Sequence, residues 1–271
     1  MMSAMVEPAD LVDVERYPIL GRDSARDVVA VARAGLAELG AAELPGFVRE
    51  DALGYLLADS QQLAPLAWRS GGVGTAYLAP PPDEVPDGHP RRWVGPYSTG
   101  AVAYDLFPAS SPLRRLYEWD ALKDFVEAVL DVGSLYRYAD PCGALNLAVM
   151  TEGDELQWHY DMTDFVVSLA IRTAESGGDF EMVPRIRSAG DEHYPDVAAV
   201  LAGDRSRVVT LEMTPGTLLI FAGRYSLHRV SPVVGGTDRW VGLLAYDTKA
   251  GTVSSQSLRA VRYGRESAPP A

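Results

Sequence analysis

The chain has 271 residues, 47% of them hydrophobic, and a formal net charge of −13. This length suits a globular protein, and so acidic a surface argues against nucleic acid, whose phosphates need Lys and Arg, and against anionic membranes. No apolar run reaches the ~18 residues that a membrane-spanning helix needs, and the N-terminal segment lacks the apolar core of a signal peptide. The single cysteine, Cys142, excludes an internal disulfide and a thiolate metal cluster. We therefore expect a cytoplasmic protein.

Helices are predicted in the first half of the chain. Apolar residues at helical spacing indicate one helix that ends at Gly40 and a second around Leu53 that ends before Pro65. Ser111 and Pro112 provide the cap and first turn of a third. Between the second and third, residues 70–100 are rich in Gly and Pro, which predicts an irregular, lid-like covering loop.

The second half changes to short strand-like runs separated by turn signals such as Gly177-Gly178 and Thr214-Pro215-Gly216. A short helix is predicted over 195–201. Many short strands of this kind are typical of a sandwich or a double-sheet jelly roll. The predicted strands cover 134–138, 144–150, 156–161, 165–171, 179–183, 208–213, 217–221, 227–231 and 240–246.

The predicted fold is therefore of the α+β class, a jelly-roll core with N-terminal helices packed on one sheet, because a sandwich of this size has an outer apolar face to cover. We interpret residues 1–271 as one functional domain. Residues 1–132 form its mainly helical layer with the lid-like loop, 133–263 its jelly-roll core, and 264–271 a disordered tail.

One motif carries the chemistry. His159 and Asp161 stand two residues apart in a predicted strand, so both side chains leave the same face of the sheet. His228, on a strand of its own, adds a second imidazole. Two histidines and one carboxylate form the facial triad of non-haem Fe(II) oxygenases, which leaves positions open on the metal. Arg239 follows on a neighbouring strand and suits a dicarboxylate cofactor, which can bind the metal at one end and a guanidinium at the other.

Over residues 134–246 the chain resembles the Fe(II)/2-oxoglutarate-dependent oxygenases, which have a double-stranded β-helix fold. Within that superfamily it is similar to the group that contains radical halogenases of free amino acids such as lysine, and their hydroxylase relatives; residues 223–232 and 245–248 are especially similar. The matching pieces are Tyr136-Arg137-Tyr138, Trp158-His159-Tyr160-Asp161, Gly177-Gly178-Asp179-Phe180, Pro215-Gly216-Thr217-Leu218, His228-Arg229-Val230 and Arg239.

The resemblance implies the roles of these residues. His159, Asp161 and His228 would hold Fe(II) at the catalytic centre, Arg239 would pair with the far carboxylate of 2-oxoglutarate, and O2 would take the last position. Tyr138 matches a position that often hydrogen-bonds the cosubstrate, although aromatic packing on a strand explains it equally well. In the halogenases a glycine or alanine replaces the carboxylate and chloride takes the vacant position. Because Asp161 is present, we expect hydroxylation of an unactivated C–H bond, with release of succinate and CO2.

The expected substrate is a free amino acid or a closely related small molecule. Asn146 is predicted to face the cavity from the strand next to the metal strand. Arg92 in the long loop is a candidate for a substrate carboxylate, against the alternative of an exposed basic pair with Arg91. Asp164 is a candidate for a substrate amine, against a role in a turn.

Other functions remain open at this point. The same iron chemistry can desaturate, close a ring or cleave a bond, because substrate positioning decides the outcome. An oxygenase of protein side chains and a non-catalytic metal-binding jelly roll that senses a small ligand are further alternatives. The oligomeric state is open, with a homodimer as one option.

Overall fold

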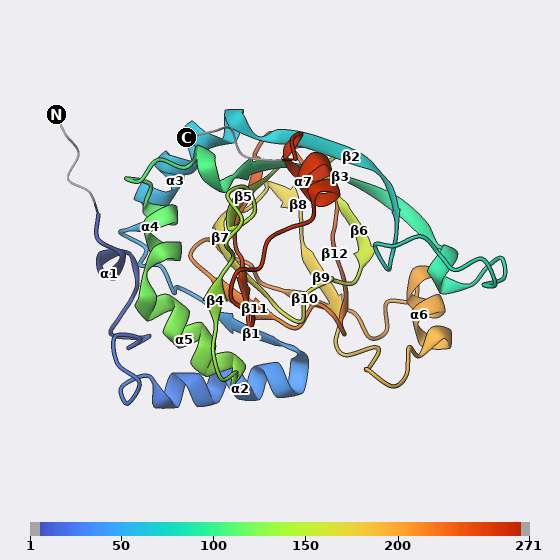
Figure 1. The fold of residues 1–271 in the computed structure, drawn as a ribbon, viewed down its shortest axis with the longest axis horizontal. Helices are drawn as coiled ribbons and strands as arrows, with labels where there is room; N and C mark the ends of the chain where they lie inside the picture. The colour runs from blue at the N-terminus through green and yellow to red at the C-terminus, as the bar shows by residue number, and fades with distance from the viewer. Residues whose placement is uncertain (1–5, 267–271) are drawn as a thin grey trace.

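Eleven of the strands in the described residues form a large antiparallel sheet that folds over on itself, and the other four form two small sheets of two strands each (Figure 1). The strands are β1 Ala41–Leu44, β2 Trp68–Thr75, β3 Val94–Ala103, β4 Tyr136–Arg137, β5 Leu145–Met150, β6 Leu156–His159, β7 Val166–Arg172, β8 Ser176–Gly177, β9 Phe180–Val183, β10 Val209–Leu211, β11 Leu218–Phe221, β12 Leu227–Val230, β13 Val233–Val234, β14 Arg239–Leu244 and β15 Tyr246–Asp247. The computed structural model describes residues 6–266.

The order of the strands defines two layers. Neighbours follow the path β1-β11-β7-β14-β5-β3-β6-β12-β9-β10, and β2 pairs with β3 beside it. Because β3 pairs with both β5 and β6, it joins a first layer, β1, β11, β7, β14 and β5, to a second layer, β6, β12, β9 and β10. The result is a nearly closed antiparallel jelly roll, as the sequence predicted.

The helices of the N-terminal half cover the first layer: Figure 1 shows α2 to α5 together on one side of the strands, with α6 on the other. Across residues 6–266, no helix combines the length and the apolar character needed to cross a membrane. The helices are α1 Pro8–Leu11, α2 Arg26–Leu39, α3 Leu53–Leu63, α4 Pro112–Glu118, α5 Asp120–Leu130, α6 Tyr194–Leu201 and α7 Gln256–Tyr263, with 3-10 turns η1 Ala64–Leu66, η2 Pro90–Arg92 and η3 Tyr104–Leu106.

Strand alternation explains why helices lie on one face of the first layer and the site on the other. On β5, Leu145, Leu147 and Val149 join the core beneath the helices. Met150 belongs instead to a cluster with Val230 of the second layer, so it faces the space between the layers. The expected arrangement of N-terminal helices packed on one sheet is therefore confirmed.

The predicted third helix is two helices. Ser111 caps it as expected, since its hydroxyl oxygen accepts a hydrogen bond from the backbone N–H of Arg114 at 3.2 Å, and Pro112 stands in the first turn. At Trp119 the backbone is extended, with ψ of 122°, and this ends α4 and lets α5 begin at Asp120.

The prediction of a loop over residues 70–100 was wrong at both ends of that range, where residues 70–75 and 94–100 lie in strands. β2 and β3 form a long hairpin there, paired from Trp68 opposite Ala101 to Thr75 opposite Val94, and only residues 76–93 connect them. The glycines of the hairpin do not interrupt its strands; they let neighbouring side chains pack close to the backbone. A Cβ on Gly95 would lie 2.5 Å from the Trp93 ring. The N-terminal layer thus contributes three strands, β1 to β3, besides its helices.

The C-terminal end of the core is also more ordered than predicted. Helix α7 was not foreseen. Residues 264–266 of the expected disordered tail have a defined position, because Gly264 ends α7 in the left-handed conformation and Arg265 pairs with Asp105 at 2.7 Å. The remainder of that tail, 267–271, lies outside the described residues.

Candidate metal centre

The strands bring the three predicted metal ligands together. His159, the last residue of β6, stands opposite His228 of β12 in the sheet, and their ring centroids are 4.2 Å apart. Asp161 lies just beyond the end of β6, where its backbone N–H donates to the carbonyl oxygen of Gly223 at 3.1 Å. One ligand atom from each of the three residues lies within 4.8 Å of the others.

Both imidazoles are held in the orientation that a metal requires. Nδ1 of His159 lies 2.7 Å from the carbonyl oxygen of Gln157, and Nδ1 of His228 lies 2.9 Å from that of Ser226. A carbonyl oxygen only accepts hydrogen bonds, so a neutral imidazole donates from Nδ1 and keeps the Nε2 lone pair free. In each case the partner is two residues earlier in the chain, so the strand itself fixes the metal-binding tautomer.

The charges of the cluster favour a cation. Burial and the neighbouring His228 lower the pKa of His159 to about 4, which keeps this imidazole neutral near pH 7. Burial acts to raise the pKa of Asp161, but the facing His228 outweighs it and holds that pKa below its ordinary value. Buried Oδ2 of Asp161 has no hydrogen-bond donor in the described part of the chain and lies 3.4 Å from Nε2 of His228. Two lone-pair atoms so close need a cation between them, and this donor set fits Fe(II).

Two aromatic rings enclose His228. The Phe221 ring meets the imidazole edge-on at 4.7 Å between centroids, and the Phe180 ring stacks at 5.6 Å. They come from β11 and β9, one from each layer, and exclude water around the imidazole. Sequence analysis gave them no role, although strand alternation would have placed both on the inner face.

Arg239 lies on the inner face of β14 with 8% of its surface exposed. Its only hydrogen bond to residues 6–266 is from Nη1 to Sδ of Met150 at 3.8 Å, and no carboxylate of that range lies within 4 Å. Burial lowers the pKa of Arg239 to about 10, partly offset by Asp179, so the guanidinium stays charged near pH 7. A buried cation without a counter-ion is costly. Its position therefore fits the carboxylate of a bound dicarboxylate such as 2-oxoglutarate.

The surroundings of Tyr138 favour the packing alternative. Its half-buried ring lies against the core beneath the helices, and its charged neighbours are Asp140 and Asp247 rather than the metal ligands. Burial raises the pKa of its hydroxyl, and the two carboxylates act in the same direction.

Of the three candidate substrate residues, one faces the interior. Asn146 on β5 is 5% exposed, and its Oδ1 is buried without a partner in residues 6–266. Arg92 instead holds its own loop together, donating to the carbonyl oxygens of Val85 and Asp83. Asp164 is exposed and pairs with Arg224. The alternatives of a loop residue for Arg92 and a turn residue for Asp164 therefore fit the structure better.

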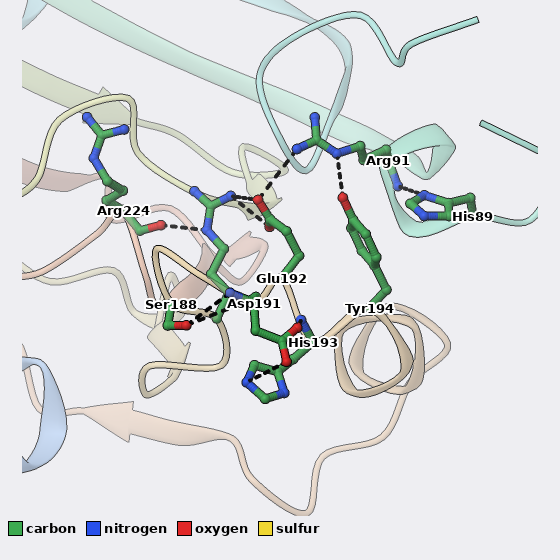
Figure 2. A network of polar contacts seen from close by, with 9 residues as sticks. His89, Arg91, Ser188, Asp191, Glu192, His193, Tyr194 and Arg224 are labelled. Atoms are coloured by element: carbon green, nitrogen blue, oxygen red, sulfur yellow. Dashed lines mark hydrogen bonds and ion pairs between the residues drawn. The ribbon is translucent and has the colours of Figure 1, made fainter. Parts of the chain in front are cut away.

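A network of polar contacts ties the long loop to the segment before α6, as Figure 2 shows. Arg91 donates to the hydroxyl of Tyr194 at 2.8 Å and pairs with Glu192 at 3.5 Å. Glu192 also pairs with Arg187 at 3.1 Å, and Arg187 donates to the backbone carbonyl of Arg224 at 2.8 Å. The guanidinium of Arg187 lies 3.8 Å from the centroid of the Tyr160 ring. In the sequence, Tyr160 stands between the metal ligands His159 and Asp161. The network thus contacts the ring of Tyr160, next to two metal ligands in the chain, and the backbone carbonyl of Arg224, next to Gly223.

Comparison with solved structures places this fold. A similar fold occurs in an oxidoreductase of the 2OG-Fe(II) oxygenase family from Burkholderia pseudomallei, with a TM-score of 0.53 and 14% identity over 82% of this chain and 92% of that one. AviO1 from Streptomyces viridochromogenes Tue57 is also similar, with a TM-score of 0.56 and 19% identity over 82% of this chain and 96% of that one. A third similar structure is that of the non-heme alpha ketoglutarate dependent epimerase SnoN from nogalamycin biosynthesis, with a TM-score of 0.56 and 14% identity over 82% of this chain and 83% of that one. At these identities the likeness shows the fold, the jelly roll of 2-oxoglutarate oxygenases.

The fold, the two-histidine, one-carboxylate cluster and the sequence family together define a 2-oxoglutarate-dependent non-haem iron oxygenase. The model of the Halogenase D family, HalD, matches residues 102–261, and the chain belongs to this family. Its cofactors are iron and 2-oxoglutarate. Comparison with curated proteins gives no match.

Proposed function

We propose that the protein hydroxylates an unactivated C–H bond of a free amino acid, or of a closely related small molecule, and releases succinate and CO2. The observation that carries this proposal is Asp161. It supplies a carboxylate to the metal cluster of a chain whose family is named for halogenation.

A carboxylate at this position opposes halogen transfer. In the halogenases that the chain resembles, a glycine or alanine stands there and chloride binds the metal instead. Oδ2 of Asp161 lies within the ligand cluster, 3.4 Å from Nε2 of His228, and its negative charge disfavours a second anion on the same metal. Oxygen transfer is then the outcome that the ligand set favours.

The remaining residues position and shield the reaction. Iron with 2-oxoglutarate and O2 would supply the oxidising power that breaks the C–H bond. His159, Asp161 and His228 would hold the iron, and Arg239 would orient 2-oxoglutarate by its far carboxylate. Phe180 and Phe221 keep water from the imidazole of His228.

The proposal is tested by incubating the purified protein with Fe(II), 2-oxoglutarate, O2 and chloride, together with a panel of free amino acids that includes lysine, ornithine and arginine. Mass spectrometry should find succinate and a product heavier by one oxygen atom. A chlorinated product from the wild-type protein would overturn the choice of hydroxylation. A product that has lost two hydrogens would favour desaturation.

Two variants link the outcome to Asp161. Asp161→Ala should abolish hydroxylation because the iron loses its carboxylate ligand. Asp164→Ala removes the same charge three residues away, from an exposed side chain paired with Arg224, and should keep full activity. Unchanged hydroxylation by Asp161→Ala would remove Asp161 from the ligand set.

A further inference from the structure

Strand β6, which ends at the metal ligand His159, also carries a buried amide oxygen without a hydrogen-bond donor. Gln157 is 5% exposed, and its Oε1 has no partner in residues 6–266. Its Nε2 donates to the backbone carbonyl oxygen of Thr75 at 3.4 Å, and this contact fixes which end of the amide is the free acceptor. A buried acceptor left unpaired costs free energy, so Oε1 is a candidate for contact with a bound ligand.

The side chains of Gln157 and His159 leave the same face of β6. They stand two residues apart, and the side chains of a strand alternate between its faces. Trp158 and Tyr160, on the opposite face, pack in one cluster with Val197 of α6, the helix that lies on the outer side of the strands (Figure 1). Gln157 therefore points to the inner side, about 7 Å along the strand from the ligand His159.

The hairpin of β2 and β3 lies against the amide of Gln157 and leaves room for it. A Cβ on Gly95 of β3 would lie 2.7 Å from Oε1, and one on Gly74 of β2 would lie 3.1 Å from Nε2. Both distances are shorter than ordinary van der Waals contact, so glycines on both strands let the amide fit. Just beyond β2, the carbonyl oxygen of Ala76 accepts the backbone N–H of Tyr160 at 2.9 Å. The hairpin and β6 thus hold the amide in a preorganised position.

An aromatic ring borders the same space. Cη2 of Trp93 lies 2.5 Å from the position of a Cβ on Gly95, so the indole and Oε1 of Gln157 are neighbours above this glycine. Trp93 is partly buried and also packs against the cluster beneath α6. An amide oxygen attracts a positively charged N–H donor through a charge-assisted hydrogen bond, and the face of an indole attracts it through the ring quadrupole. The pair therefore suits an ammonium group.

We propose that Oε1 of Gln157 accepts a hydrogen bond from an ammonium group of the substrate, with the Trp93 ring beside it. The hairpin of β2 and β3 then forms the amine-binding side of the substrate site, on the strand face that also carries His159. This inference rests on the proposed amino-acid substrate and names the residue that selects its amine. Two earlier candidates for substrate contacts, Arg92 and Asp164, have partners of their own.

The test measures binding rather than turnover. Protein loaded with Fe(II) and 2-oxoglutarate, kept free of O2, is titrated calorimetrically with the same amino-acid panel and with analogues that lack one amino group. For lysine these analogues are norleucine, without the side-chain amine, and ε-aminocaproate, without the α-amine. The wild type should bind the amino acid at least about tenfold more tightly than one of its analogues.

Gln157→Met keeps the length of the side chain but replaces the amide by a thioether, and it should remove most of that preference. Gly95→Ala is a second variant that leaves Gln157 in place. Its methyl group displaces Oε1, so the same preference should fall. Trp93→Leu should lower the preference by a smaller factor, because only the contact with the ring is lost. The ratio between two ligands measured on one protein is insensitive to a general loss of binding.

A matched control removes an amide from the surface. Gln61→Met on α3 should keep the full preference, because Gln61 is exposed. The affinities of each variant for Fe(II) and 2-oxoglutarate show that the metal centre is intact. If Gln157→Met and Gly95→Ala both keep the wild-type preference for the amine, the inference fails and the proposed function stands. If no panel member binds or is oxidised by the wild type, the proposed amino-acid substrate fails, and the inference with it.

Discussion

Gly223 lies directly against the carboxylate of Asp161. Its carbonyl oxygen accepts the backbone N–H of Asp161 at 3.1 Å, and a Cβ on Gly223 would overlap the Asp161 carboxylate, with Cγ only 2.6 Å away. Any residue can adopt the backbone conformation of Gly223, since its φ is not in the left-handed region. A glycine is needed there because a Cβ atom has no space beside the Asp161 carboxylate. The connection between β11 and β12 thus supports one metal ligand, and β12 itself carries another, His228.

Gly223→Ala should therefore weaken iron binding without removing a ligand. The added methyl group displaces the carboxylate of Asp161 from the cluster, and we expect the affinity for Fe(II) to fall at least about tenfold, within the range for residues that support metal ligands. A titration of metal-free protein with Fe(II) or Co(II), followed by optical absorption, measures this change.

Gly54→Ala is the matched control for that variant. A Cβ at Gly54 meets nothing within 4 Å, and the residue lies in helix α3, where alanine is favoured over glycine. Metal affinity should be unchanged and stability equal or higher. Equal metal affinities for the two variants would mean that Asp161 moves freely to accommodate the methyl group.

Arg239→Gln should weaken 2-oxoglutarate binding by at least about tenfold, because a charge-assisted hydrogen bond to a carboxylate is lost. Calorimetric titration of the iron-loaded protein without O2 measures it. Arg172→Gln on the neighbouring strand β7 is the control, since Arg172 is already paired with Asp238 at 3.1 Å. If Arg239→Gln and the control bind 2-oxoglutarate alike, the cosubstrate carboxylate lies elsewhere.

The predictable part of the site is the part encoded locally. The common face of His159 and Asp161 follows from the two-residue period of a β-strand. His228 and Arg239 stood out as an imidazole and a guanidinium on predicted strands of their own, and the resemblance implied their roles. The jelly roll and its strand positions followed from alternating runs and turn signals. The hairpin of β2 and β3 was missed because its glycines look like breaks in a strand, whereas they allow Tyr97, Trp93 and Gln157 to approach closely.

What the sequence could not give is which charged side chains are already paired. Arg92 and Asp164 looked free, yet Asp164 pairs with Arg224, sixty residues away in the chain. Partners of this kind depend on tertiary contacts that no local pattern records.

The metal-free protein should lose stability as the pH falls from about 6.5 towards 4. The pKa of His159 is lowered to about 4 in the folded protein, so the unfolded chain binds this proton first. The contribution of neutral His159 to the free energy of unfolding is fully present above about pH 6.5 and is lost by about pH 4, which lowers that free energy by about 3 kcal/mol. Urea unfolding across this pH range measures the loss. His159→Gln should lack this step, and an unchanged pH dependence in the variant would assign it to other groups.

Arg187→Met should lower both stability and metal affinity. The side chain of Arg187 is 13% exposed, pairs with Glu192 at 3.1 Å and lies over the Tyr160 ring at 3.8 Å. Loss of a desolvated cation–π contact and of charged hydrogen bonds should reduce the free energy of unfolding by about 2 kcal/mol or more. Because Tyr160 stands between two metal ligands and Arg187 holds the carbonyl next to Gly223, the affinity for Fe(II) should fall as well.

The comparison variant for Arg187 is Arg207→Met. Arg207 pairs with Asp196 at 3.1 Å, but both side chains are about half exposed, at 50% and 52%. An exposed pair of this kind contributes less than about 1 kcal/mol, and metal affinity should not change. Chemical denaturation and Fe(II) titration of both variants give the two quantities. If Arg187→Met costs no more than Arg207→Met and binds iron as tightly as the wild type, the network in Figure 2 does not support the metal centre.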